Sequence, residues 1–235
     1  MIDKREIKTV FVDIDDTVWW FTENSKVSLR HVYDAFDLQH CEPSYEAFRD
    51  IYLEKNHELW LLYHHGKINK DYLITERFRY TLEKIGITGD LQQLAEKIDN
   101  EYLDFLGRQK LVVPGAKEML EYLGKHYAVH ALSNGFKGTQ ERKLASGGVD
   151  HLIDKVIISD NCGYTKPMRG IFDYALRECG CSVDEVVMIG DNADADIRGA
   201  HDAGWKTIYF NIHGTAPSDV ADAEINSLDE VKNLL

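Results

Sequence analysis

Three carboxylates follow an apolar segment near the start of the chain. The stretch VFVDIDDTV, residues 10–18, places Asp13, Asp15 and Asp16 within four positions. Like charges this close raise one another's pKa and repel, so folding alone gives no reason to place them there. They could form a solvated acidic turn, or they could hold a cation. The other polar clusters of the chain bear on that choice.

Similar polar clusters follow three later apolar segments. Ser133 and Asn134 come after YAVHAL, and Lys166 comes a short loop after VIIS. The segment VVMI is followed by GDNADAD, which contains Asp191 and Asp196. In open parallel sheets, ligands bind at the carboxyl ends of the strands. If the four apolar segments are neighbouring strands, their polar residues meet at one edge and form a binding site.

The pattern of apolar residues predicts the elements that position this site. Short apolar runs at 8–14, 127–133, 155–160, 185–191 and 206–211 indicate strands, and the last four alternate with amphipathic helices. This alternation is typical of proteins in which helices cover both faces of a parallel sheet. We therefore expect an α/β fold with a Rossmann-like, doubly wound parallel sheet.

The segment between the first two strands has a helical periodicity throughout. Leu29 and Val32, for example, share one helical face, and no strand pattern interrupts the run. We expect residues 1–17 and 112–235 to form the core domain and residues 18–111 to form an inserted helical domain.

The charge of the chain restricts its partners. A net charge of −13 argues against a basic face that grips a nucleic acid polymer or an anionic membrane. It does not forbid a small anionic substrate. The first ten residues, MIDKREIKTV, lack the apolar core of a secretory signal, and no apolar run reaches the ~20 residues that span a bilayer. A cytoplasmic location is the resulting expectation.

The ordered set of polar clusters carries a family resemblance. DIDDT, the Ser133-Asn134 strand end, the Lys166-Pro167 pair and GDNADAD resemble, in order, the four motifs of the haloacid dehalogenase-like (HAD) hydrolase superfamily. The helical insertion lies between the first and second motifs, where the helical C1-type caps of that superfamily sit. The resemblance implies a HAD-like core, a C1-type cap and a hydrolase activity.

The resemblance also implies roles for the acidic residues. Asp13 would be the nucleophile that attacks phosphorus and forms an aspartyl-phosphate. Asp15 would protonate the leaving oxygen and later take a proton from water. A Mg²⁺ cofactor would be held by the Asp13 carboxylate, the Asp15 backbone carbonyl and Asp191, which relieves the repulsion among the carboxylates.

The remaining motif residues would assist these groups. Ser133 and the backbone amide of Asn134 would bind the phosphoryl oxygens, and Lys166 would neutralise the nucleophile and the transferring group. Thr17 would support the turn through its hydroxyl. Asp196 would orient either the waters of the metal or Lys166.

The acid at position 15 separates the reactions known in this superfamily. The dehalogenases resemble D-x-Y-G-T at the first motif and need no acid there, so Asp15 favours phosphoryl transfer over carbon–halogen cleavage. A phosphate- or metal-sensing module without turnover would tolerate loss of Asp15 or Lys166, and both are present. A phosphomutase remains an alternative to a phosphatase.

The inserted segment bears on the class of substrate. NHELWLLYHHGKINKDYLITERFR, residues 56–79, together with SNGF and KPMRGIFDYAL, resembles noncanonical pyrimidine 5′-nucleotidases. This implies a nucleoside monophosphate as the small phosphorylated substrate, with a sugar-phosphate or phosphoglycolate phosphatase as the alternative. The base, the sugar and the oligomeric state stay open.

Residues that would recognise a base must come from the insertion or from the segment after Asp15, because the core motifs bind only phosphate. A stacked aromatic ring contributes about 1–3 kcal/mol per base. The candidates are four aromatic and two polar residues: Trp19, Trp20, Trp60, Tyr63, Asn56 and Arg77. Packing between helices is the alternative role for each aromatic residue.

Overall fold

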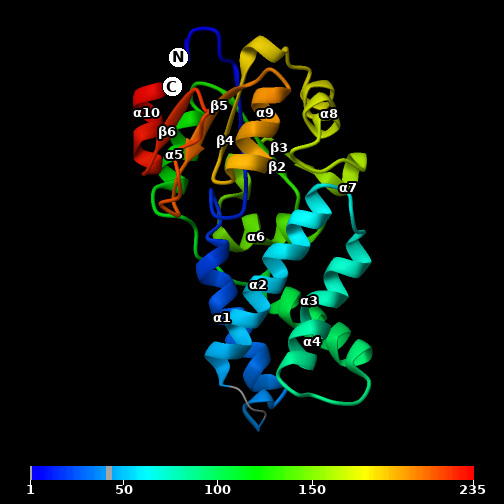
Figure 1. Cartoon of the computed structure of the whole chain (residues 1–235). Helices are drawn as coiled ribbons and strands as arrows, with labels where there is room; N and C mark the ends of the chain where they lie inside the picture. Colours follow the sequence, from blue (N-terminus) through cyan, green and yellow to red (C-terminus); the bar gives the residue numbers. More distant parts are fainter. Residues whose placement is uncertain (1, 41–43) are drawn as a thin grey trace. The chain divides into compact units, whose positions relative to one another are not determined.

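The chain forms two compact units, each with its own core (Figure 1). The computed structural model describes residues 2–40 and 44–235. One unit contains Met1–Phe21 and Lys110–Leu235, and the other contains Thr22–Gln109. Residues 18–21 belong to the first unit because their backbone pairs with residues 111–113. The Trp20 amide donates to the Leu111 carbonyl at 3.0 Å, and the Val113 amide donates to the Val18 carbonyl at 2.9 Å.

A six-stranded parallel sheet organises the first unit. In spatial order the strands are β3 (Lys155–Ile158), β2 (Ala128–Ser133), β1 (Thr9–Val12), β4 (Val186–Gly190), β5 (Lys206–Phe210) and β6 (Ala223–Ile225). Every neighbouring pair is parallel. β1 and β4 are buried at every position, which explains why they read as continuous apolar runs. The predicted α/β fold with a parallel sheet is confirmed.

Helices connect the strands of this unit (Figure 1). They are α5 (Ala116–Leu123), α6 (Thr139–Gly147), α7 (Ser159–Cys162), α8 (Arg169–Cys179) and α9 (Gly199–Asp202), and α10 (Val231–Leu234) follows the last strand. Phe11 and Leu132 from the sheet and Ile171 and Phe172 from α8 lie in one buried apolar cluster. This packing anchors the central strands, and with them the loops at their carboxyl ends.

Two details of the sheet unit differ from the expectation from sequence. β3 ends at Ile158, and the following residues form α7, where the apolar run indicated a strand to residue 160. The sequence pattern did not indicate β6, which has only three residues, AEI. A strand of three residues with a charge at its centre is too short for an alternating or apolar run to stand out.

The second unit is helical. Its helices are α1 (Phe21–Ala35), α2 (Tyr45–His64), α3 (Lys70–Lys84) and α4 (Leu91–Leu106). Asn69 and Asp90 cap α3 and α4 by accepting the amides of Tyr72 and Gln93. No helix in the described part of the chain is both long and apolar enough to cross a membrane.

A buried ion pair lies in the core of the helical unit. The Arg77 Nε atom of α3 donates to Asp99 Oδ1 of α4 at 2.7 Å, and both side chains are almost fully buried. The Arg77 guanidinium also lies over the Tyr102 ring, 5.4 Å from its centroid. Burial raises the pKa of Asp99, while Arg77 opposes the rise. The two charges therefore depend on each other for stability.

Arg77→Met is expected to lower the free energy of unfolding by about 3–5 kcal/mol, because it leaves Asp99 buried without its counter-charge. Urea unfolding followed by far-ultraviolet circular dichroism measures this loss. Arg49→Met is the control: Arg49 pairs with Asp50 at the surface, where such a pair contributes at most about 1 kcal/mol. Equal losses in the two variants would contradict the assigned role of the buried pair.

Candidate active site

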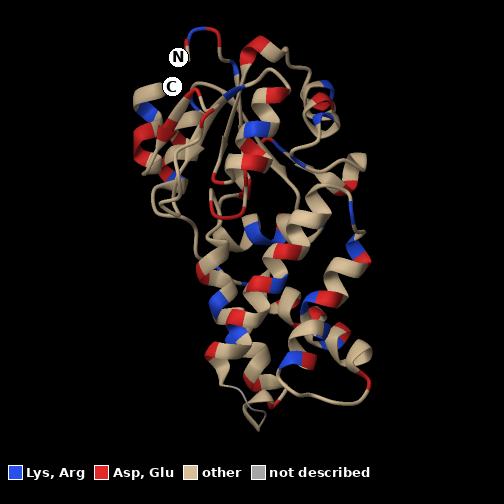
Figure 2. Cartoon of the chain, in the orientation of Figure 1, with Lys and Arg blue, Asp and Glu red and all other residues tan. Residues whose placement is uncertain are grey.

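Acidic residues gather at the carboxyl ends of β1 and β4, which are neighbours in the sheet (Figure 2). Asp13 directly follows β1, and its amide continues the ladder by donating to the Ile189 carbonyl of β4 at 2.9 Å. Asp191 directly follows β4. The parallel pairing of β1 and β4 therefore places these two carboxylates at one edge of the sheet.

Lys166 lies between two of the carboxylates. Its Nζ atom is 2.5 Å from Asp13 Oδ1 and 2.6 Å from Asp196 Oδ1, and it also donates to the Leu132 carbonyl at 2.7 Å. All three charged side chains are at least nine-tenths buried. A buried ammonium held this way fixes the position of the Asp13 carboxylate and leaves its second oxygen for other contacts.

Burial shapes the electrostatics of this cluster. It raises the pKa of Asp13 to about 7 and the pKa of Asp191 to about 6, and it also raises the pKa of Asp196. Burial alone would lower the pKa of Lys166, but the adjacent Asp13 and Asp196 raise it above its ordinary value. Lys166 pairs with Asp13 and Asp196, and Asp191 adds a third carboxylate to the same edge, which leaves an excess of negative charge that a cation would offset.

The Asn134 side chain fastens the segment that carries Lys166. Its Nδ2 atom donates to the Lys166 carbonyl at 2.8 Å, and its Oδ1 atom accepts the Lys166 amide at 2.7 Å. Both functional atoms of this side chain are used in this reciprocal pair. A ligand can therefore contact Asn134 only through its backbone.

Ser133 ends β2 and accepts two hydrogen bonds through its hydroxyl oxygen. The donors are the Gly135 amide at 3.1 Å and the Gln140 Nε2 atom at 2.6 Å. The Gln140 side chain lies so close to Gly135 that a Cβ atom there would meet it at 2.3 Å. Glycine at 135 is therefore what allows Gln140 to reach Ser133.

Asp15 is held by two residues of α6 that the sequence analysis missed. Lys143 Nζ donates to Asp15 Oδ1 at 2.6 Å, and Gln140 Nε2 donates to Asp15 Oδ2 at 2.9 Å. Both donors are buried. Their spacing of three residues puts them on the same face of a helix. This spacing can be read from the sequence, but it does not show that Asp15 is the residue they contact.

The Asp191 carboxylate contacts two side chains at the same edge. Thr17 Oγ1 donates to Asp191 Oδ1 at 3.3 Å, and His213 Nε2 lies 3.2 Å from Asp191 Oδ2 and 3.8 Å from Asp16. The hydrogen bond to Asp191 raises the pKa of His213, while burial opposes the rise. The sequence analysis missed His213, although its place just after the end of β5 is the position that identified the other residues.

Asp16 is buried, not solvated as a simple acidic turn would require. Its φ of 55° lies in the left-handed region, which aspartate adopts more readily than most residues. The turn is closed by its amide, which donates to the Trp19 carbonyl at 2.8 Å. This conformation bends the chain directly after Asp15.

Asp196 owes its position to a short π-helical turn, Ala193–Arg198. Asn192 begins this turn: its side chain accepts the amides of Asp194 and Ala195, and its own amide donates to Asp196 Oδ2 at 3.1 Å. A Cβ atom at Gly190 would lie 2.3 Å from the Asp196 carboxylate. The glycine at the end of β4 therefore makes room for the acid that pairs with Lys166.

The donor set fits a hard divalent cation. Single carboxylate oxygens of Asp13, Asp191 and Asp196 lie within 4.8 Å of one another, as do ligand atoms of Asp16, Asp191 and His213. Carboxylate oxygens are the ligands that Mg²⁺ prefers. The excess of negative charge around Lys166 is the second feature that suits a cation here.

Two of the six residues proposed from sequence to recognise a base are not available for that role. Trp19 is fully buried, and Lys143 lies over its ring. Arg77 is buried and paired with Asp99 inside the helical unit. The position of Trp19 next to the catalytic turn suggested a contact with the ligand, but its ring packs in the interior. The position of Arg77 in the helical insertion suggested the same, but its guanidinium pairs with a buried counter-charge.

The other four residues differ in their exposure. Asn56, on α2, is buried as well. Trp20 is half-buried and directly precedes α1. Trp60 and Tyr63 are half-buried neighbours on α2, with ring centroids 5.6 Å apart in an edge-to-face arrangement. These three aromatic residues remain candidates for contact with a ligand.

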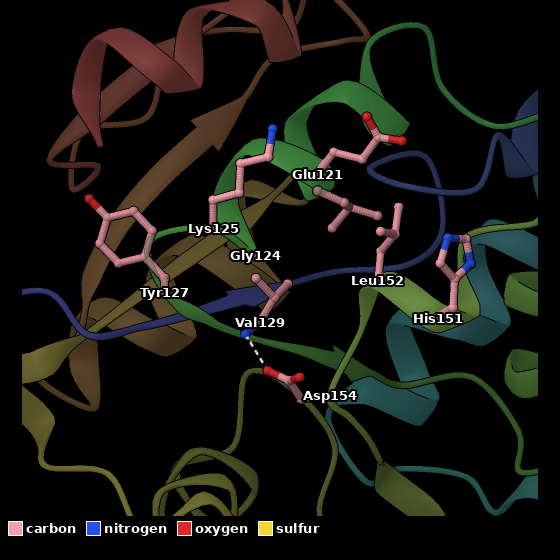
Figure 3. A pocket seen from close by; sticks show the side chains of 9 residues that line it. Glu121, Gly124, Lys125, Tyr127, Val129, His151, Leu152 and Asp154 are labelled. Carbon is pink, nitrogen blue, oxygen red and sulfur yellow. Dashed lines mark hydrogen bonds between the residues drawn. The ribbon is translucent and has the colours of Figure 1, made fainter.

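A surface cavity of about 360 Å³ lies elsewhere in the sheet unit (Figure 3). It is lined by residues that include Glu121, Tyr127 and Val129, and Asp154 accepts the Val129 amide there at 2.9 Å. Val129 is near the amino end of β2, whereas Ser133 ends that strand. The cavity is therefore at the opposite end of the strand from the carboxylates and is not the candidate active site.

Known proteins resemble the chain over nearly its full length. The chain is 26% identical to the HAD-hydrolase YfnB of Bacillus subtilis over 98% of this chain and 96% of that protein. It is 29% identical to the pyrimidine 5′-nucleotidase YjjG of Escherichia coli over 96% of each. It is 28% identical to the glyceraldehyde 3-phosphate phosphatase of Pyrococcus furiosus over 98% of this chain and 94% of that one.

The fold is shared as well. A crystal structure of YfnB bound to magnesium superimposes with a TM-score of 0.89 at 25% identity, covering 97% of this chain and 98% of that one. The family model for haloacid dehalogenase-like hydrolases matches residues 7–204, which include the carboxylates at the sheet edge, Ser133 and Lys166. This protein is thus an enzyme of the haloacid dehalogenase-like hydrolase family.

Proposed function

We propose that this hydrolase is a Mg²⁺-dependent phosphatase that works through an aspartyl-phosphate on Asp13 and acts on pyrimidine nucleoside monophosphates. The observation that carries the phosphatase assignment is the pair of acids at the end of β1. Lys166 holds Asp13 at 2.5 Å, and a separate pair of donors holds Asp15, two residues further along. A nucleophile and a general acid–base group are the two functions that phosphate ester hydrolysis requires here.

The first step transfers the phosphoryl group. The free oxygen of the Asp13 carboxylate attacks phosphorus, and the bond between phosphorus and the ester oxygen breaks. The protonated Asp15 carboxyl donates its proton to the departing oxygen, so that an alcohol leaves and Asp15 becomes a carboxylate. Asp13 then carries the phosphoryl group as a mixed anhydride.

The second step releases phosphate. Water attacks phosphorus, its proton passes to the Asp15 carboxylate, and the bond between phosphorus and the Asp13 oxygen breaks. Inorganic phosphate forms, and both aspartates return to their starting states. The Ser133 hydroxyl, the Asn134 backbone amide and the Lys166 ammonium stabilise the charge on the phosphoryl oxygens in both steps.

The cation has a defined place in this proposal. The Asp13 and Asp191 carboxylates and the Asp15 backbone carbonyl would hold Mg²⁺, with Asp196 orienting Lys166 beside it. When bound, Mg²⁺ neutralises charge on the phosphoryl oxygens and orients the group for in-line displacement. Thr17 and His213 hydrogen-bond to Asp191 and keep that carboxylate in place.

Relatives support the substrate class. YjjG, the nucleotidase similar over 96% of this chain, is named for pyrimidine nucleotides, and the cap segment 56–79 resembles noncanonical pyrimidine nucleotidases. The Pyrococcus enzyme supports a second candidate, a small sugar-phosphate phosphatase. The two differ in whether a ring of the substrate stacks on an aromatic side chain.

Pyrimidine nucleoside monophosphates are expected to be hydrolysed with a higher kcat/KM than hexose phosphates or phosphoglycolate. One stacked ring at about 1–3 kcal/mol corresponds to a preference of about 5- to 150-fold. Steady-state kinetics with Mg²⁺ across both substrate groups measures it. A preference for sugar phosphates would leave the phosphatase assignment intact and remove the nucleotidase assignment.

Alanine variants of Trp20, Trp60 and Tyr63 identify the stacking residue. Replacement of the residue that stacks on the base should lower kcat/KM for a nucleotide by about 5- to 150-fold. The value of kcat/KM for p-nitrophenyl phosphate should change little. Trp19→Ala is the matched control, because its ring is fully buried and its loss should depress both substrates together through stability.

A further inference from the structure

We propose that Gln140 and Lys143 are positioning residues that orient the Asp15 carboxylate and the Ser133 hydroxyl in the phosphoryl site. Lys143 serves the second step of the reaction. Lys143 aims the Asp15 carboxylate at the attacking water, and Gln140 ties that carboxylate to the Ser133 hydroxyl. This inference rests on the aspartyl-phosphate mechanism proposed above, but not on the identity of the substrate.

The contacts of Asp15 define its state in the structure. Each of its two carboxylate oxygens accepts one short hydrogen bond from α6, 2.6 Å from Lys143 and 2.9 Å from Gln140. Two donors on two separate oxygens fix the rotation of the carboxylate as well as its position. With both oxygens placed as acceptors, this arrangement matches the carboxylate that takes a proton from water in the proposed second step.

Lys143 is placed at a considerable cost in solvation. Only 5% of its side chain is exposed, and its ammonium lies 5.0 Å from the centroid of the Trp19 ring and 5.2 Å from that of Phe21. Burying an ammonium is unfavourable unless a counter-charge and aromatic faces compensate it. Asp15 supplies that counter-charge, so the position of Lys143 depends on holding Asp15.

Gln140 joins two groups that act on the same phosphoryl centre. Its two amide hydrogens go to Asp15 Oδ2 and to Ser133 Oγ, which is 2.6 Å away. The Ser133 oxygen also accepts the Gly135 amide at 3.1 Å, so both of its lone pairs are used. Its own hydrogen must then point away from these donors, as a donor for a phosphoryl oxygen.

The two residues therefore act on different steps. Without Lys143, the carboxylate that removes the proton from water loses its orientation, while attack of Asp13 on the ester is little affected. Without Gln140, the Ser133 hydroxyl also loses its orientation, and both steps become slower. A purely structural role would not separate the two residues in this way.

The experiment measures the two steps with p-nitrophenyl phosphate, whose good leaving group needs little help from an acid. Lys143→Met keeps the length of the side chain and removes the ammonium. Its kcat should fall by about 10- to 100-fold, up to the smallest contribution of about 100-fold that a general base makes, because Asp15 itself is still present. Its KM should fall in proportion, so that kcat/KM stays within about threefold of the wild-type value. A burst of about one equivalent of p-nitrophenolate per enzyme should precede the steady state.

Gln140→Met tests the other residue in the same assay. Its kcat/KM should fall by at least about tenfold, because Ser133 takes part in the first step. Arg142→Met is the control on the same helix: it removes one exposed positive charge and should leave both constants unchanged. If Lys143→Met does not fold, as judged by its melting temperature, Lys143→Gln replaces it and should show the same slow second step.

A double variant tests whether Lys143 acts through Asp15. Adding Lys143→Met to Asp15→Asn should lower kcat no further than Asp15→Asn does alone. A wild-type kcat in Lys143→Met, a matching loss of kcat/KM without a burst, or additive losses in the double variant would each overturn the proposal. These outcomes leave the proposed mechanism standing, whereas an active Asp13→Asn enzyme would remove the mechanism itself.

Discussion

Asp13→Asn should lower the hydrolysis of every phosphate ester by at least about 10⁴-fold, in line with the loss of a nucleophile in other enzymes that use covalent catalysis. An amide cannot form the mixed anhydride with phosphate. The fold should persist, because Lys166 keeps Asp196 at 2.6 Å and the Leu132 carbonyl at 2.7 Å when the Asp13 carboxylate is absent. Initial rates with p-nitrophenyl phosphate and a nucleoside monophosphate measure the loss.

The control for this variant is Asp194→Asn, in the same acidic sequence as Asp191 and Asp196 but exposed to solvent. It should retain nearly full activity, which would show that the loss in Asp13→Asn does not arise from a change in net charge. The thermal unfolding of Asp13→Asn should resemble that of the wild type. Activity above a few per cent in a folded Asp13→Asn sample would mean that another group is the nucleophile.

Removal of divalent cations should also lower the activity strongly. Treatment with EDTA should reduce activity by at least about 100-fold, and Mg²⁺ should restore it, because the carboxylates of Asp13, Asp191 and Asp196 otherwise repel one another and the substrate. Ca²⁺ should restore little activity, since its looser and higher coordination positions the reacting groups poorly. Rates after dialysis against chelator, with each metal added back, measure this dependence.

Asp191→Ala should reproduce the effect of the chelator, and added Mg²⁺ should not rescue it. Asp202→Ala removes an exposed carboxylate from α9 in the same unit and should behave as wild type. Isothermal titration of the two variants with Mg²⁺ separates a binding defect from a catalytic one. Full activity of the wild-type enzyme after complete removal of metal would contradict the cation site.

Part of the active site could be predicted because it lies on segments with strong local signals. Asp13, Ser133 and Asp191 each stand at the end of a short apolar run, and such runs in alternation with amphipathic helices are typical of strands in a covered parallel sheet. The parallel order β2-β1-β4 then brings the three ends together. For these residues, local pattern and fold class were sufficient.

Other residues of the site have no local signal of this kind. Gln140 and Lys143 lie on a short helix whose sequence reads as an ordinary polar face, and only their contacts with Asp15 distinguish them. His213 follows β5 but comes to Asp191 through the sheet order, which places β5 beside β4. Such contacts join residues that are far apart in sequence, and periodicity within a segment contains no information about them.

The amino-acid sequence by itself determined the α/β class, the parallel sheet and the family. The reason is that a strand buried on both faces appears in the sequence as a short apolar run, and the four motifs appear in a fixed order along the chain. The tertiary structure alone decided which side chains are free to meet a ligand. It buries Trp19 under Lys143 and pairs Arg77 with Asp99, although both residue types suggest binding. The physical reason is that an aromatic ring or a guanidinium stabilises a protein interior as well as a complex, and only the surrounding atoms determine which of the two it does.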